Sequence, residues 1–210
     1  PEAEPLYLRA LEASERTLGP EHPSTLISVN NLALLYSNQG RYAEAESLYL
    51  RSMEAHERTL GPEHPSTLIS VGSLALLYSR QGRYPEAEPL YLRALEASER
   101  TLGPDHPSTL ISVNNLAWLQ LELGRSASRD GFQRCLLAWS DPADWKHHWM
   151  RLGIGLCDAL DTGDFASAER VIVDLETLLG VDHNRVSSAH EKLGLVRGIL
   201  QGHFKSATRP

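Results

Sequence analysis

Apolar residues along the first 125 positions follow two alternating helical patterns. Segment 24–39 is apolar at 26, 27, 29 and 32–36, too dense for a one-sided amphipathic helix, so we expect it to pack on more than one side. Segment 42–60 instead places Ala45, Leu48 and Tyr49 at helical spacing, with charged residues between them. This second pattern is typical of a half-exposed helix. We call the dense kind helix A and the amphipathic kind helix B.

The two patterns recur with a period of 42 residues. Residues 85–117 repeat residues 1–33 with one change, Glu21 to Asp105, and residues 43–75 form a more divergent copy between them. A helix pair cannot bury both of its faces alone, so neighbouring pairs must stack. The period therefore predicts an all-α, right-handed solenoid of antiparallel helix pairs. Copies this similar indicate recent duplication, so identity among them does not identify functional residues.

Glycine and proline predict where these helices begin and end. Gly40 and Gly82 are expected to end helices A, where a glycine at the C-terminus is favoured. Pro62 cannot continue a helix B, whereas Pro65 suits the first turn of the next helix A. Pro89 falls one turn into a helix B, where it removes one hydrogen bond and is tolerated.

The 42-residue unit resembles the tetratricopeptide repeat, in the long form seen in kinesin light chain. The matching residues are Leu32, Ala33 and Tyr36 on helix A, Gly40 and Tyr42 in the turn, and Ala45, Tyr49 and Ser52 on helix B. The segment Leu-Gly-Pro-Glu-His-Pro, followed by Asn-Asn-Leu-Ala-Leu-Leu-Tyr, is specific to the long form. In this family the stack curves and leaves a groove, lined mainly by helices A, that holds an extended peptide or a partner's helix.

The regular units end near residue 125. Residues 1–125 are expected to hold regular repeats that start inside a helix B, and residues 126–210 to continue as divergent helical pairs. Echoes of the repeat occur at 163–169, 179–183 and 202–204, and Asp141-Pro142 with Asp144 looks like a helix start. Because the chain begins inside a helix pair, we expect it to be a piece of a longer protein.

A stripe at helical spacing on each helix A is expected to face the groove. This groove stripe comprises Ile27, Asn31, Leu34 and Asn38, then Ile69, Ser73, Leu76 and Arg80, then Ile111, Asn115, Trp118 and Glu122. By resemblance, Asn31 and Asn115 match the asparagines that hold a ligand's backbone, since an amide offers a donor and an acceptor together. Gly72 and Ser73 interrupt this asparagine ladder.

Other groove residues are expected to set ligand preference. Asn30 and Asn114 flank the asparagines, Leu34, Leu76 and Trp118 would supply apolar pockets, and Arg80 could pair with an acidic ligand residue. Each has an alternative role. The asparagines could cap a helix or bond to a neighbouring one, Trp118 could belong to the core, and Arg80 could be solvated.

Composition and charge exclude several classes of protein. The net charge of -7 argues against a nucleic-acid-binding surface, which needs a positive footprint. Only two cysteines are present, so a disulfide-stapled fold is excluded and a cytoplasmic location is expected. No apolar run is long enough to span a bilayer, and no signal peptide opens the chain.

Candidate chemistry is sparse. His22, His64 and His106 occupy the same linker in successive units and are interpreted as turn residues; His147 with His148, and His183 with His190, do not form a clear metal site. Cys157 lies in an apolar helical stretch, which predicts a buried, inert thiol. No phosphate-binding or hydrolase motif is present, so we expect no catalytic site, metal or cofactor.

Tryptophans gather at 118, 139, 145 and 149, where they predict either a larger hydrophobic core or a docking surface for another domain. For the whole chain, the sequence predicts a non-catalytic scaffold that binds a peptide segment or a partner protein in its groove. The alternative is a sensor or regulatory arm of a larger protein. In that case a nucleotide-switching or protease-like domain outside this chain would give the output.

Overall fold

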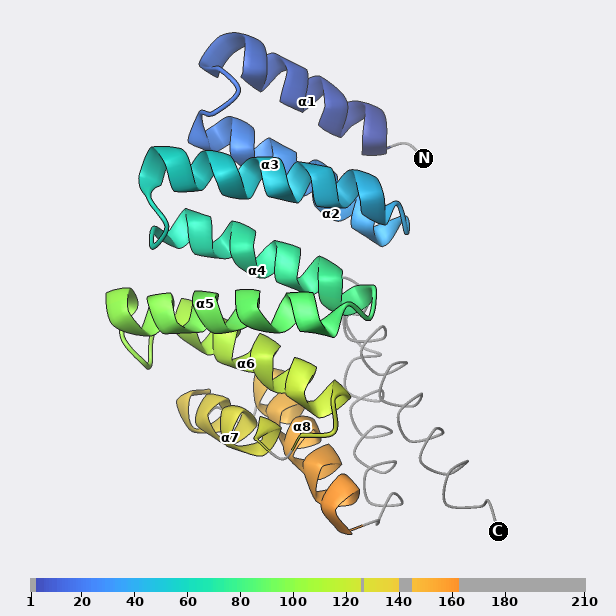
Figure 1. The fold of residues 1–210 in the computed structure, drawn as a ribbon, viewed down its shortest axis with the longest axis vertical. Helices are drawn as coiled ribbons and strands as arrows, with labels where there is room; N and C mark the ends of the chain where they lie inside the picture. The colour runs from blue at the N-terminus through green and yellow to red at the C-terminus, as the bar shows by residue number, and fades with distance from the viewer. Residues whose placement is uncertain (1–2, 126, 140–144, 163–210) are drawn as a thin grey trace. The chain divides into compact units, whose positions relative to one another are not determined.

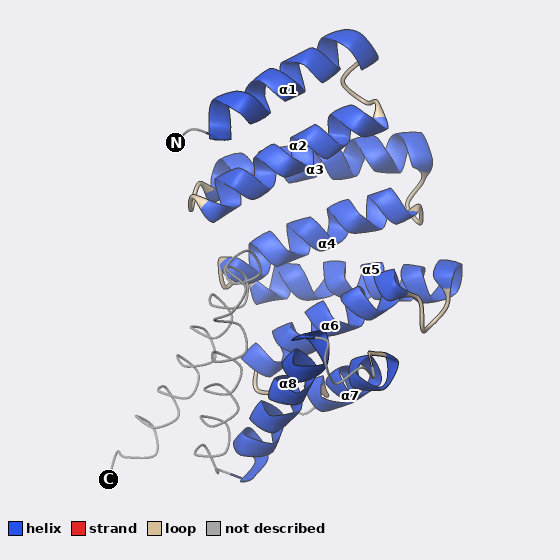
Figure 2. Ribbon diagram, turned by 180° about the vertical axis from the view of Figure 1, so that it is seen from behind, coloured by secondary structure: helices blue, strands red, loops and turns tan. Residues whose placement is uncertain are grey.

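The computed structural model describes residues 3–125, 127–139 and 145–162, and these residues form α-helices joined by short linkers (Figure 1). The helices are α1 (Ala3–Leu18), α2 (Pro23–Asn38), α3 (Tyr42–Leu60), α4 (Pro65–Arg80), α5 (Tyr84–Leu102), α6 (Pro107–Glu122), α7 (Ser128–Ala138) and α8 (Trp145–Thr162). Figure 2 shows them from behind, with no strand in the described part. The chain divides into two compact units, residues 1–115 and 116–210.

The first unit alternates the two kinds of helix. The helices A are α2, α4 and the start of α6, and the helices B are α1, α3 and α5. Each of the helices α1 to α4 packs against the next one along the chain. Helices A supply most of the core, including Leu26, Val29 and Ala33, whose side chains are fully buried. The predicted all-α fold of repeated helix pairs is therefore confirmed.

The linker from helix B to helix A is fixed by a short polar motif. His22 accepts a hydrogen bond at Nδ1 from the backbone N–H of Ser24 (3.2 Å), and Pro23 occupies the first helical position. Thr25 donates its hydroxyl to the carbonyl of Gly19 (2.8 Å), whose φ of +94° favours glycine. The same bonds recur, at 3.1 to 3.2 Å for the cap and 2.8 Å for the threonine, in the linkers that end at Thr67 and Thr109. The repeated histidines are thus helix N-caps.

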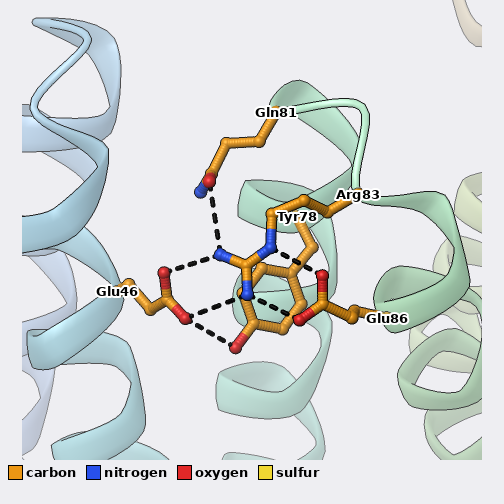
Figure 3. Close-up of polar contacts among 5 residues, drawn as sticks. All are labelled: Glu46, Tyr78, Gln81, Arg83 and Glu86. Carbon is orange, nitrogen blue, oxygen red and sulfur yellow. Dashed lines mark hydrogen bonds and ion pairs between the residues drawn. The ribbon is translucent and has the colours of Figure 1, made fainter.

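An arginine joins successive helices B (Figure 3). Arg83 donates to Glu46 of α3 (2.8 Å) and to both carboxylate oxygens of Glu86 of α5 (2.6 Å each). Its guanidinium lies 4.1 Å from the ring centroid of Tyr78, whose hydroxyl donates to Glu46 (2.9 Å). Burial, and then the bond to Glu46, raises the pKa of Tyr78. Arg41 makes the equivalent joint one repeat earlier.

The described part of the second unit has an aromatic core. The ring of Trp118 packs edge-on against Phe132, with 5.1 Å between ring centroids, and lies 5.0 Å from Trp149. Gly153 is required beside this cluster, because a Cβ there would lie 2.7 Å from the Phe132 ring. The core interpretation of the tryptophan-rich segment therefore holds for Trp118 and Trp149, which are both buried.

Both cysteines are buried and unpaired with each other. Burial raises the pKa of Cys135 to about 11 and also raises that of Cys157, whose sulfur lies 3.1 Å from the Ser128 hydroxyl. A thiol with a raised pKa is a poor nucleophile, so the prediction of an inert Cys157 is consistent with its surroundings.

Several sequence predictions lie outside the described residues. They are the helix start at 141–144, the repeat echoes at 163–169, 179–183 and 202–204, and the pair His183 and His190. The side chains of Trp145 and His148 also fall outside the description.

Candidate functional site

A ladder of exposed isoleucines marks one face of the helices A. Ile27, Ile69 and Ile111 stand 42 residues apart and are 59%, 62% and 54% exposed. Leu34 adds a further exposed apolar side chain on α2, at 43%. Most other hydrophobic residues on helices A enter the core, so the isoleucine left in water in each repeat is a regular feature of this face. Exposed apolar side chains gathered on one face are a candidate interaction site.

Helices A are also nearly free of charge. Helix α2 contains no charged residue, and Arg80 is the only one on α4. The acidic and basic side chains of the repeats lie mostly on the helices B, where they form ion pairs between neighbouring units such as Arg51–Glu15 (2.6 Å) and Arg93–Glu57 (2.6 Å). The negative net charge of the chain therefore says little about the apolar face.

The groove stripe of the first unit lies on this face. Asn31 and Asn38 are exposed, whereas Ser73, Leu76 and Asn115 are half-buried. These side chains come from three successive helices A. Asn38 of α2 bonds to Arg80 of α4, and Ser73, Leu76 and Asn115 of α4 and α6 line one cavity, so residues distant in sequence do come together.

Arg80 joins two helices A rather than standing alone in solvent. Its Nη1 donates to the hydroxyl of Ser37 (3.0 Å) and to Oδ1 of Asn38 (3.1 Å), both on α2. Two predicted groove residues, Asn38 and Arg80, thus bond to each other. The sequence suggests that Arg80 either pairs with a ligand or is solvated, and neither prediction anticipates its bond to Asn38.

Asn30 bonds to a neighbouring helix, which is the alternative role that the sequence left open for it. Its amide nitrogen donates to the hydroxyl of Ser70 on α4 (3.3 Å). The amide oxygens of Asn30 and Asn114 are buried and have no hydrogen-bond partner among the described residues. Trp118 likewise lies in the core, 3% exposed, and therefore offers no wall to the apolar face.

Ser70 also belongs to a buried polar cluster with His56 and Ser52. Its hydroxyl lies 3.0 Å from Nδ1 of His56 and 3.2 Å from the hydroxyl of Ser52. Burial lowers the pKa of His56, which favours the neutral imidazole. His56 and Ser52 occur only in the middle repeat, since both neighbouring repeats carry serine and alanine, respectively, at these positions.

A cavity of about 320 Å³ opens between α4 and α6, beside the end of α5. Five residues of the groove stripe, from two successive repeats, line it: Ile69, Ser73, Leu76, Ile111 and Asn115. The remaining lining residues are Pro65, Leu68, Gly72, Ser98, Leu102, Ser108 and Ser112, so no charged side chain lines the cavity. We call it the Gly72 pocket.

Sequence reasoning identified the stripe but missed the contribution of Gly72, Ser98 and Ser112 to this pocket. The available signal is that Gly72 replaces the asparagine found at this position in the flanking repeats. From the sequence, this glycine indicates only an interruption of the asparagine ladder.

No group of three or more potential metal ligands occurs among the described residues, and His22, His64 and His106 act as caps. No helix in this part of the chain is long and apolar enough to cross a membrane.

Comparison with known proteins agrees with the repeat geometry. The tetratricopeptide repeat family model matches residues 1–47, 27–97 and 70–128. The chain therefore belongs to the tetratricopeptide repeat family. Repeats of this family generally mediate protein–protein interaction, and such repeat proteins are typically non-catalytic. Among curated protein sequences, none gives a significant match.

Solved structures of kinesin-light-chain type share the fold. Two crystal structures of a putative kinesin light chain of Podosopora anserina with nearly identical TPR-like repeats, one of them a point variant, are each 24% identical to this chain. Their TM-scores are 0.65 for the variant and 0.64 for the other structure, over 87% of this chain and 88% of that one. BtubC (BKLC) from P. vanneervenii is 23% identical, with a TM-score of 0.67 over 86% of this chain and 73% of that one.

Proposed function

We propose that this chain is a non-catalytic scaffold that binds a segment of a partner protein along the apolar face of its helices A. The isoleucine ladder, next to the uncharged Gly72 pocket, is the observation that carries the proposal. Covering large aliphatic side chains with a partner removes them from water, which lowers the free energy of the complex. Their repetition at one position per unit suits an extended ligand that runs across several units.

Polar stripe residues would hold the ligand's backbone. Asn31, Ser73 and Asn115 lie on successive helices A and can donate or accept hydrogen bonds whatever the ligand's sequence. Leu34 and Leu76 would contact apolar ligand side chains. Arg80 would act mainly by holding Asn38 in place, because it bonds to Asn38 directly.

The same binding face would serve a regulatory arm of a larger protein, with the output located elsewhere. Two buried cysteines that do not pair with each other are consistent with the cytoplasm as the location.

Selection from a random-peptide display library on the native chain tests this function. We expect selected peptides to lose binding when Ile69→Lys and Ile111→Lys are combined, because two lysines place charge on the apolar face. Leu92→Lys is the matched control, since Leu92 is a 39%-exposed apolar residue on helix B. Peptides that bind the double variant and the control equally well would show that the apolar face is not the binding site.

A further inference from the structure

The first unit contains two junctions between successive helices A, and they differ at corresponding positions. Junction 1 lies between α2 and α4, and junction 2 between α4 and α6. Counting 42 residues forward, Asn30 corresponds to Gly72, and His56 corresponds to Ser98. Ser70 and Ser112 are the corresponding serines, one in each junction.

Junction 1 is filled by two large polar side chains. Asn30 donates to the Ser70 hydroxyl (3.3 Å), and Nδ1 of His56 lies 3.0 Å from the same hydroxyl. His56 is only 2% exposed, so its ring occupies the interior of the junction.

Junction 2 has lost both of these side chains. Gly72 and Ser98 stand in their places, and both line the Gly72 pocket together with Ser112. The pocket therefore occupies the space that, one repeat earlier, holds an amide and an imidazole.

Neither backbone geometry nor packing requires a glycine at position 72. Gly72 lies inside α4 with an ordinary helical φ, and a Cβ built there would meet no atom within 4 Å. Gly153 differs, because a Cβ there would lie 2.7 Å from Phe132. A glycine inside a helix is destabilising relative to alanine. What Gly72 provides at this cost is open space.

We propose that the Gly72 pocket is the anchoring subsite of the binding face and receives one uncharged apolar side chain of the bound segment. This inference rests on the proposed function and states which ligand side chain the binding face would select. The pocket's size lies at the lower end of ligand cavities, which suits one or two side chains.

Charge complementarity favours an uncharged anchor. No charged residue lines the pocket, so a charged ligand side chain would lose its hydration there without gaining a counter-ion. Aliphatic walls from Ile69, Leu76 and Ile111 instead match an apolar side chain, and the serine hydroxyls and the amide of Asn115 can bond the neighbouring ligand backbone.

Filling junction 2 with the side chains of junction 1 tests the proposal. The double variant Gly72→Asn with Ser98→His reproduces a combination that the preceding junction already accommodates. The probe is a peptide selected from the random-peptide display library on the native chain, and its affinity is measured by calorimetry. We expect roughly 10- to 100-fold weaker binding, the effect of excluding one aliphatic side chain from its pocket.

Two matched controls accompany this variant. Ser14→His makes the same serine-to-histidine change at the corresponding position of α1, away from the pocket, and should leave the affinity unchanged. Replacing the peptide's apolar anchor by alanine should weaken binding to the native chain but have little further effect on the filled variant, since the pocket is then already closed. Thermal unfolding followed by circular dichroism checks that both variants fold.

The outcomes separate the two proposals. If selected peptides lose binding with Ile69→Lys and Ile111→Lys but bind the filled variant as well as the native chain, the pocket proposal fails and the proposed function stands. A selected peptide that prefers aspartate or lysine at the anchor position also overturns the pocket proposal. If no peptide depends on the apolar face, the proposed function fails and the pocket proposal fails with it.

Discussion

Junctions 1 and 2 share one scaffold but differ in their interiors. The histidine cap and the threonine bond recur at the starts of α4 and α6 with nearly the same distances. At the centre, however, junction 1 holds a polar cluster around His56, and junction 2 holds a cavity beside Gly72. The repeated residues therefore build the stack, and the few residues that vary between repeats decide what the apolar face can accept.

The largest expected effect comes from emptying junction 1. His56→Ala removes a buried ring and leaves Ser70 with fewer partners, so the free energy of unfolding should fall by about 2–3 kcal/mol. Urea denaturation measures this change. Ser98→Ala at the corresponding position of junction 2 should cost less than about 1 kcal/mol, because a small hydroxyl beside a cavity is removed. Equal losses at the two positions would contradict the difference between the junctions.

Two glycine substitutions should shift stability in opposite directions. Gly72→Ala should stabilise the protein by about 0.5–1 kcal/mol, since the added methyl group meets open space and glycine is unfavourable inside a helix. Gly153→Ala should destabilise it by roughly 1–3 kcal/mol, because its methyl group would collide with Phe132. Thermal unfolding of both variants checks the signs. A destabilised Gly72→Ala would show that the pocket is not open at that point.

Acid should weaken junction 1 selectively. Burial lowers the pKa of His56 in the folded state below its value of about 6.5 in the unfolded chain. Between these two pKa values the unfolded state binds more protons than the folded state. The stability that neutral His56 contributes is therefore fully present above about pH 6.5 and is lost as the pH falls through the folded-state pKa. Ser52 and Ser70 face the ring, and after burial a like-charge interaction with His64 also lowers the pKa of His56.

Denaturation curves at several pH values measure this effect. His56→Ser, which restores the residue of the neighbouring repeats, should flatten the dependence between about pH 7 and pH 5, the range in which a histidine changes charge. An unchanged slope in that variant would assign the acid sensitivity to other groups.

The smallest expected differences concern the arginine joint, because Arg41 and Arg83 make equivalent joints one repeat apart. Arg83→Ala should lower the melting temperature, since it removes ion pairs to two helices and the contact with Tyr78. Arg83→Lys should recover only part of the loss, because lysine cannot bind Glu86 through two parallel bonds. Arg41→Ala should have a similar effect to Arg83→Ala. Arg58→Ala, at a more exposed ion pair with Glu21, should change the melting temperature less.

Much of the fold could be predicted from local signals. The predicted helix 42–60 matches α3, and the predicted 24–39 differs from α2 by one residue at each end. These boundaries were predictable because glycine, proline and cap residues act within a few positions of themselves. The N-cap role of His22 was not predicted, since histidine is an uncommon cap and its bond depends on the orientation of the ring.

The candidate site was predictable only in part. Spacing placed Ile69, Ser73 and Asn115 on one face, and the structure brings all three to the Gly72 pocket. Spacing could not show that Trp118, at the corresponding position of the stripe, is buried between Phe132 and Trp149. Those partners come from the divergent helices, where the period no longer predicts what packs against what.

The sequence by itself determined the repeat length, the helix boundaries, the separation of charged helices B from nearly uncharged helices A, and membership in a binding-repeat family. Only the tertiary structure decided that Asn30 and His56 meet at one serine while Gly72 and Ser98 leave a cavity at the equivalent place. Periodicity fixes which face a side chain occupies, because it depends on the local helix alone. Whether the space beyond that face is filled depends on side-chain volumes contributed by three helices at once.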